Sequence, residues 1–112
     1  MDRKLKPVVF QGDSLDSICA FPDNAKRRAG YELDRVQHGL NPTDWKSMPS
    51  VGAGIREIRI KTGLQFRVIY IARLSDGIHV LHAFQKKTQK TSKRDIDLAK
   101  KRLQSLIRSQ NA

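Results

Sequence analysis

Positively charged side chains interrupt or follow three apolar segments in the second half of this sequence. Lys86 and Lys87 come shortly after the last of these segments. Arg67 interrupts the middle segment, and Arg59 alternates with isoleucines in the first. Lysine and arginine at the ends of strands are well suited to hold phosphate oxygens. The pattern therefore predicts a small curved sheet that presents cations to the phosphates of RNA.

Each of these cations has a second possible role. Arg67 is the best candidate for a phosphate clamp, because an unpaired guanidinium in an apolar strand is costly and its planar fork matches phosphate oxygens. The alternative is a structural ion pair with Glu57 or another acid. Arg59 either adds a second phosphate contact or is a solvated surface residue. Lys86 and Lys87 bind phosphate, transfer protons, or form a merely basic turn.

The overall composition favours an anionic partner. The chain has 112 residues, with 22 Lys and Arg against 11 Asp and Glu, a formal charge of +11 and a pI of about 10.3. This excess of positive charge is typical of proteins that bind nucleic acid, an anionic membrane surface or an acidic protein. Hydrophobic residues make up 38% of the chain, too many for a disordered basic tail.

Neither a membrane span nor a signal peptide is visible in the sequence. The longest apolar runs are much too short to cross a bilayer, and the N-terminus leads into no long apolar segment. Cys19 is the single cysteine, so no disulfide forms within the chain. These features predict a cytoplasmic protein without membrane contact. We expect Cys19 to be a small core residue.

Hydrophobic periodicity predicts strands and helices along the whole chain. Strands are expected at residues 5–10, 55–60, 66–73 and 78–84. Helical turns are expected at residues 13–20, and residues 41–54 are expected to form a loop because they are rich in Pro, Gly and Ser. A longer helix ending near Gly39 has these apolar positions on one face: Ala25, Ala29, Leu33, Val36 and Leu40. A last helix, capped by Ser92, has these: Ile96, Ala99, Leu103, Leu106 and Ile107.

This order of elements indicates an α+β fold. We expect residues 1–112 to form a single domain, in which helices pack on one face of a small antiparallel sheet. The other face, or its rim, is then left for function.

Three strings that occur in this order carry a resemblance to a known family. They are Glu57-Ile58-Arg59-Ile60, Phe66-Arg67-Val68-Ile69-Tyr70, and the segment 81–91 with its Phe-x-Lys-Lys-x-x-Lys-Thr pattern. Together they resemble the phage-derived, HigB-type branch of the RelE/ParE toxin superfamily. The similarity extends over about residues 8–102, and the last pattern is its most specific part.

The resemblance implies a RelE-like fold and the toxin half of a type II toxin–antitoxin pair. Many such toxins are endoribonucleases that cut messenger RNA, commonly on the ribosome, and are silenced by a helix-turn-helix antitoxin. Other members of the superfamily inhibit DNA gyrase, and a third possibility is a non-catalytic module that only occupies RNA or the ribosome.

RNA cleavage adds requirements to the site: the 2′-hydroxyl must lose a proton and the departing oxygen must gain one. Tyr70 either positions a base or is a core tyrosine, and His82 either transfers a proton or is a hydrogen-bonded core histidine. His38 and His79 are expected at the surface. Trp45 either stacks on a base or folds onto the domain. Further candidate RNA contacts are Lys90, Lys93 and Arg94.

No metal or cofactor site is expected. The sequence has no cluster of His, Asp and Glu at the spacing of metal ligands, so a cation-rich mechanism without metal is the natural interpretation. One departure from the family concerns proton transfer. RelE-like enzymes often have a tyrosine close to the C-terminus, whereas the last tyrosine here is Tyr70.

Overall fold

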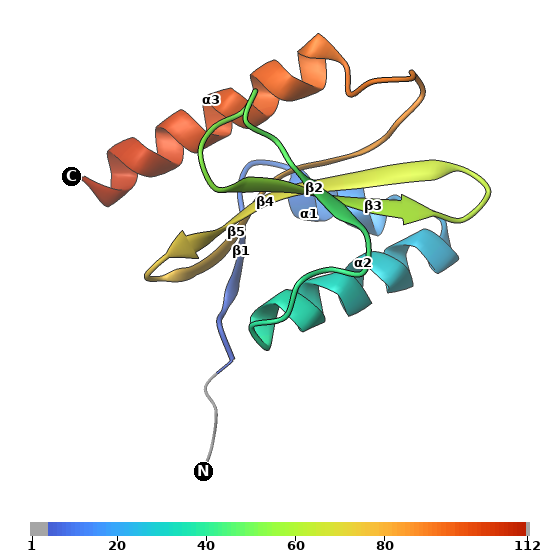
Figure 1. Cartoon of the computed structure of the whole chain (residues 1–112), viewed down its shortest axis with the longest axis horizontal. Helices are drawn as coiled ribbons and strands as arrows, with labels where there is room; N and C mark the ends of the chain where they lie inside the picture. The colour runs from blue at the N-terminus through green and yellow to red at the C-terminus, as the bar shows by residue number, and fades with distance from the viewer. Residues whose placement is uncertain (1–4, 112) are drawn as a thin grey trace.

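The computed structural model describes residues 5–111, which form three helices and five strands (Figure 1). The helices are α1 (Ser14–Cys19), α2 (Asp23–Gln37) and α3 (Lys93–Gln110). The strands are β1 (Val8–Phe10), β2 (Trp45–Ser47), β3 (Ile55–Lys61), β4 (Gln65–Leu74) and β5 (Gly77–Gln85). The predicted α+β class is confirmed, and the arrangement is compatible with a RelE-like fold.

All five strands belong to one sheet with the order β1-β5-β4-β3-β2. The strands β2 to β5 pair antiparallel, whereas β1 runs parallel to β5, so the sheet is mixed. The predicted antiparallel pairing of the three strands in the second half of the chain is confirmed, and β1 adds an edge strand whose parallel pairing the sequence did not indicate. The chain reaches the rest of the sheet from β1 through α1 and α2, and such a long connection permits parallel pairing.

Helices cover both faces of the sheet, which corrects the expectation that all of them lie on one side. In Figure 1, α2 lies below the sheet and α3 above it. One apolar core joins α1 and α2 to the sheet through residues such as Ile18, Leu33 and Val68. A second core joins α3 to the opposite face through residues such as Ile69 and Leu103. β4 is thus buried on both sides, which explains its nearly continuous apolar sequence.

The predicted helices are confirmed, with differences at their ends. The buried stripe of α2 stops at Val36, and Leu40 follows the helix with 52% of its surface exposed. On α3, Ile107 is exposed although it was expected on the buried face. Cys19, expected in the core, ends α1 as an exposed thiol because Ile18 is the residue that faces the sheet.

Two short elements were predicted differently from the structure. The short strand β2 lies inside the segment that was expected to be a loop, and β1 is shorter than the predicted strand. No helix within residues 5–111 combines the length and the apolar character needed to cross a membrane.

Candidate functional site

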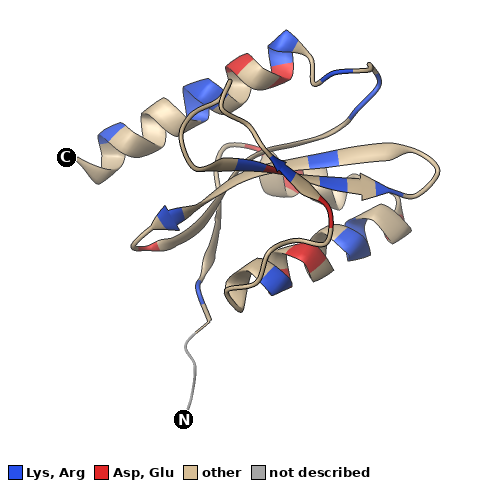
Figure 2. Cartoon of the chain, viewed as in Figure 1, with Lys and Arg blue, Asp and Glu red and all other residues tan. Residues whose placement is uncertain are grey.

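The pairing of β3, β4 and β5 brings several charged residues onto one face of the sheet. Arg59 lies opposite Arg67, and Arg67 lies opposite Phe84 on β5. Lys86 follows β5, and its backbone N–H donates to the carbonyl of Gln65 at 2.8 Å. This cationic cluster lies on the face that α3 covers, but beyond the residues that α3 touches. Figure 2 shows Lys and Arg on neighbouring strands and on the segment leading into α3.

Arg67 and Glu57 form a buried pair at the base of this cluster. Their side chains are 2% and 1% exposed, and Arg67 Nε lies 3.5 Å from Glu57 Oε1. The other guanidinium nitrogens of Arg67 donate to the carbonyl of Phe66 and to the side chain of Gln65, at 3.0 and 2.8 Å. The alternative of a structural ion pair with Glu57 is therefore seen in the structure, and the role of Arg67 as a phosphate clamp stays a prediction.

The buried pair leaves two polar atoms open. Thr91 Oγ1 donates to Glu57 Oε2 at 2.7 Å, but neither Glu57 Oε1 nor Arg67 Nε has a hydrogen-bond partner within residues 5–111. Burying such atoms without partners costs free energy, and burial lowers the pKa of Arg67. The protein thus maintains charge under this part of the sheet at the expense of its own stability.

Arg59 is held by an acid on the neighbouring segment. Its Nε and NH2 atoms lie 2.8 and 2.7 Å from Asp44 Oδ1, and the two side chains are 35% and 37% exposed. Arg59 is therefore neither a freely solvated residue nor buried, and part of its guanidinium surface remains open to a ligand. Its role as an RNA contact stays a prediction.

Lys86 lies in a positively charged environment at the edge of the cationic cluster. It is half-buried, and this burial, together with the positive charges of Arg67, Lys46 and Arg59, lowers its pKa, while Glu57 opposes the shift. Proton transfer by a lysine requires a lowered pKa of this kind. The direction of the shift agrees with what the sequence required of a proton-transferring lysine.

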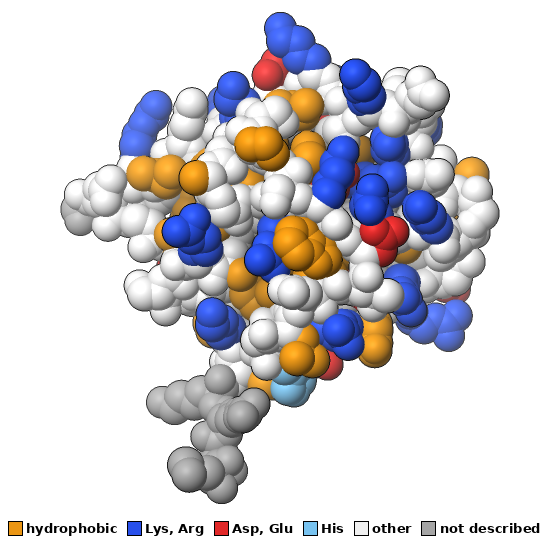
Figure 3. All heavy atoms as spheres, viewed as in Figure 1, with side chains coloured by type: hydrophobic (Ala, Val, Ile, Leu, Met, Phe, Trp, Pro, Cys, Tyr) orange, Lys and Arg blue, Asp and Glu red, His pale blue; other side chains and the backbone are white. Residues whose placement is uncertain are grey.

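The other predicted lysines and arginines lie around the same region at the surface. Lys87 and Lys90 are exposed on the segment between β5 and α3, and Lys93 and Arg94 are exposed in the first turn of α3. On the face seen in Figure 3, basic side chains are numerous and acidic ones are few. This surface supplies electrostatic attraction for a polyanion.

Tyr70 and Trp45 do not lie with the cationic cluster. Tyr70 pairs with Arg56, and Trp45 pairs with Ile58, which places both aromatic side chains toward the other face of the sheet. Tyr70 is 1% exposed, and burial raises the pKa of its hydroxyl. The Trp45 ring lies 4.0 Å from the guanidinium carbon of Arg56. Tyr70 is therefore placed as a core tyrosine, and Trp45 is folded onto the domain.

His82 faces α3 because of a bulge in β5. Strict alternation would group His82 with Ile78 and Val80, but the register shifts by one residue between Val80 and His82, so these residues face opposite sides of the sheet. His82 Nε2 lies 2.7 Å from Asp95 Oδ1, whereas His82 Nδ1 is buried without a partner in the described residues. His82 thus connects β5 to the start of α3 and does not join the cationic cluster.

Asp95 joins this contact to the N-terminal cap of α3. Its backbone N–H donates to Ser92 Oγ at 3.2 Å, and Ser92 Oγ donates to Asp95 Oδ2 at 2.7 Å. The predicted cap at Ser92 is confirmed, whereas the Asp95 carboxylate accepts from the Ser92 hydroxyl and not from its backbone N–H, so the reciprocal half of a capping box is not formed. The cap and the histidine contact together fix where the lysine-bearing segment, residues 86–92, enters the helix.

Removing Asp95 should therefore destabilise the protein more than removing the cap alone. We expect Ser92→Ala to lower the free energy of unfolding by about 1 kcal/mol, the usual cost of a lost cap. Asp95→Ala should cost roughly 2–3 kcal/mol, because it also leaves both ring nitrogens of buried His82 without partners. Urea denaturation followed by circular dichroism measures both values, and equal losses would contradict the role given to the histidine contact.

The sequence did not reveal several residues that shape the site. Lys46 lies on β2 opposite Glu57, and it was hidden in a segment interpreted as a loop. Thr91 is 34 residues from the glutamate it contacts, so no local pattern connects them. His79 was expected at the surface but is buried between Asp76 and Gln11, at 2.8 and 3.0 Å from their side chains, so that prediction was wrong. His38 is exposed, as predicted.

No three His, Cys, Asp or Glu side chains group together as metal ligands in residues 5–111.

Comparison with known families agrees with the sequence resemblance. Residues 16–104 match the model of a family described as phage derived protein Gp49-like (DUF891), which covers well over half of the chain. No curated protein matches the chain at a significant level.

Proposed function

Because this chain belongs to the Gp49-like family of phage-derived proteins, a RelE/HigB-like toxin family, we propose that it is a HigB-type toxin that cleaves messenger RNA. The family implies an antitoxin partner, and we propose that this partner is a helix-turn-helix protein encoded beside the toxin. We further propose that cleavage takes place on the ribosome in the cytoplasm and needs neither metal nor cofactor. Residues 1–112 act as one domain in this proposal.

The observation that carries the proposal is the environment of Lys86. A half-buried lysine whose pKa is lowered by burial and by neighbouring cations gives up its proton more readily than an ordinary lysine, as a base in RNA cleavage must. A lysine that only attracted RNA would gain nothing from this environment. The same residues that lower the pKa also offer positive charge to a phosphate that gains negative charge during the reaction.

The proposed reaction follows from this arrangement. Neutral Lys86 accepts the proton of the 2′-hydroxyl, and the 2′-oxygen attacks the adjacent phosphorus. The bond from phosphorus to the 5′-oxygen breaks, and Lys46, exposed beside Lys86, is the candidate acid that protonates the departing oxygen. Arg59 and Lys87 hold the phosphate. The products are a 2′,3′-cyclic phosphate and a 5′-hydroxyl.

Arg67 has an indirect part in this reaction. Its guanidinium is turned toward Glu57 and already donates to two protein oxygens, so in this state it does not offer its fork to solvent. Its charge still acts on Lys86, because it is the second largest cause of the lowered pKa after burial. We therefore propose Arg67 as a positioning and electrostatic residue.

The test uses purified protein in a translating extract that contains a defined message. We expect new RNA ends with 5′-hydroxyl and cyclic-phosphate chemistry in the complete extract, and their absence with Lys86→Met. Naked RNA treated with the protein tests whether cleavage needs the ribosome. The same reaction with EDTA added tests whether cleavage needs a metal ion. Inhibition of translation without new RNA ends would favour a binding module, and inhibition of purified gyrase would favour the gyrase alternative.

A further inference from the structure

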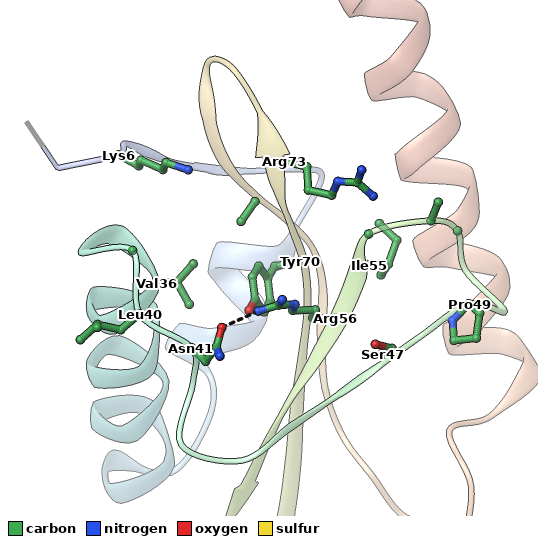
Figure 4. A pocket seen from close by; sticks show the side chains of 15 residues that line it. Lys6, Val36, Leu40, Asn41, Ser47, Pro49, Ile55, Arg56, Tyr70 and Arg73 are labelled. Atoms are coloured by element: carbon green, nitrogen blue, oxygen red, sulfur yellow. Dashed lines mark hydrogen bonds between the residues drawn. The ribbon is translucent and has the colours of Figure 1, made fainter.

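A hollow lies beyond the C-terminal end of α2, at the end of β4 that is far from Lys86, which lies beside Gln65 at the start of this strand. Its volume is about 610 Å³, and it is lined by residues from α2, β3 and β4 and from the segments that flank them. In Figure 4, Tyr70 and Arg56 form its floor between the strands and α2. α2 covers this face of the sheet only as far as Val36, which leaves the start of β3 and the end of β4 open.

The rim of this hollow is positively charged and has no built-in counter-ion. Lys6, Arg56 and Arg73 are among the lining residues, and none of the lining residues is Asp or Glu. In the part of the chain that the structure describes, no carboxylate lies within 4.0 Å of these three cations, whereas Arg59, Arg67 and Arg102 each have an acidic partner. Three cations around one concave site form a receptor for negative charge.

Contacts with the rest of the protein hold one of these cations, Arg56, in place, and a second, Arg73, packs against the backbone at Gly54. Arg56 donates to Asn41 Oδ1 at 2.8 Å (Figure 4). Its guanidinium also lies over the Trp45 ring, and these two contacts order it. Arg73 passes over Gly54, where a Cβ atom would come within 2.4 Å of the Arg73 side chain. Gly54 also has a φ of +76°, so the backbone at this position favours glycine for two reasons. Arg56 is thus preorganised before any ligand arrives.

The same hollow offers apolar surface next to the charges. Val36, Ile55 and Ala72 contribute to its wall, and Leu40 stands at its edge with 52% of its surface exposed. An RNA backbone would use the cations but would gain little from these aliphatic groups. A peptide that carries a carboxylate beside an apolar side chain would use both.

We infer that this hollow is the docking site for an acidic, partly apolar segment of the antitoxin, with a carboxylate bound between Arg56 and Arg73. The inference rests on the proposed function, because it takes the partner to be an antitoxin. The site lies at the opposite end of β4 from Lys86. A partner anchored here therefore leaves the cationic cluster uncovered and silences the toxin by blocking its access to the ribosome.

The experiment compares two charge reversals of equal size. One variant combines Lys6→Glu and Arg73→Glu at the hollow, and the control combines Lys100→Glu and Lys101→Glu on the exposed side of α3. Arg56 is left in place because its loss would also release Trp45. The probe is the purified product of the neighbouring reading frame, and its affinity is measured by isothermal titration calorimetry. Circular dichroism and thermal unfolding confirm that both variants fold, and Lys6→Gln/Arg73→Gln serves as a milder form.

We expect the hollow variant to bind the partner at least about tenfold more weakly, with the control close to the unchanged protein. In cells, the hollow variant should still arrest growth but should no longer be rescued by co-expression of the partner. Equal affinities of the hollow and control variants would overturn the inference, as would failure of the unchanged protein to bind the partner.

Two further results separate the inference from the proposed function. Loss of affinity for a single-stranded RNA oligonucleotide in the hollow variant, with partner affinity intact, would assign the hollow to RNA and overturn the inference. If the unchanged protein binds the partner through the hollow but neither arrests growth nor cuts RNA, the inference stands and the proposed function fails.

Discussion

Lys86→Met should lower the rate of RNA cleavage by roughly 10²–10⁴-fold, the range that a positioned general acid or base contributes. Partial burial and the nearby charge of Arg67 lower the pKa of Lys86, which increases the share of neutral amine. The neutral amine is the form that accepts a proton from the 2′-hydroxyl. Methionine is of similar length but carries no proton to exchange. Single-turnover cleavage of a labelled RNA in the translating extract measures the effect.

The dependence of the cleavage rate on pH tests whether Lys86 acts as a base. Because the base acts when deprotonated, the rate should rise with pH through the pKa of Lys86, and it should fall again at higher pH, where the acid that protonates the departing oxygen loses its own proton. The midpoint should lie below 10.5, the ordinary lysine value, since the environment lowers this pKa. Lys86→Arg keeps the positive charge but stays protonated throughout this range. It should therefore retain most of the affinity for RNA while losing the rate.

Lys100→Met on α3 is the matched control, because it removes the same charge from an exposed position away from the cluster. We expect it to cut at the normal rate. Normal cleavage by Lys86→Arg would show that Lys86 holds phosphate and does not transfer the proton.

The sequence was most informative where one pattern decided the local structure. The apolar stripe from Ala25 to Val36 and the alternation of Ile58 and Ile60 predicted α2 and β3, because burial of one face dominates the energy of such elements. Ser92 followed three residues later by Asp95 predicted the start of α3 for an equally local reason.

Features that depend on pairing between distant residues were not predictable in the same way. The bulge in β5 changes the face on which His82 lies, and no residue type in β5 indicates that a bulge forms there. His79 is buried because Gln11 and Asp76 close over it, and these partners come from other segments. The hollow near Arg56 depends on where α2 stops relative to the sheet, which hydrophobic periodicity does not describe.

The cationic site contains both residues that the sequence predicted and residues that it did not. Lys86 and Arg59 were found because they stand at visible places in apolar strands. Lys46 was not predicted as a site residue, because the three residues of β2 are too few to show the alternation of a strand. For Arg67, the phosphate clamp and the structural ion pair were both inferred from a charge in an apolar strand. The structure shows that Arg67 forms an ion pair with Glu57.

Arg67→Met should lower the free energy of unfolding by roughly 3–5 kcal/mol, because it leaves Glu57 buried without its counter-charge. The side chain of Glu57 is 1% exposed, so water does not replace the lost partner. Glu57→Gln in the same chain should restore much of the loss, since glutamine carries no charge and still accepts the hydrogen bond from Thr91. Chemical denaturation of the single and double variants measures the coupling.

The matched control is the same substitution at the neighbouring position of the sheet. Arg59 lies opposite Arg67 and is paired with Asp44, but both partners are about one-third exposed. Surface pairs of this kind contribute about 0–1 kcal/mol, so Arg59→Met should be nearly neutral for stability. Equal losses at Arg59 and Arg67 would show that burial of the Glu57 pair does not matter.

The pH profile then separates the structural role of Arg67 from its effect on the reaction. The charge of Arg67 lowers the pKa of Lys86 and that of Glu57 raises it. Arg67→Met removes the first influence and keeps the second, so the midpoint of the cleavage rate should move to higher pH. In Arg67→Met/Glu57→Gln both charges are absent, and the midpoint should lie between those of Arg67→Met and the unchanged protein if the influence of Arg67 is the larger. A midpoint that stays in place while stability falls would limit Arg67 to holding the fold together.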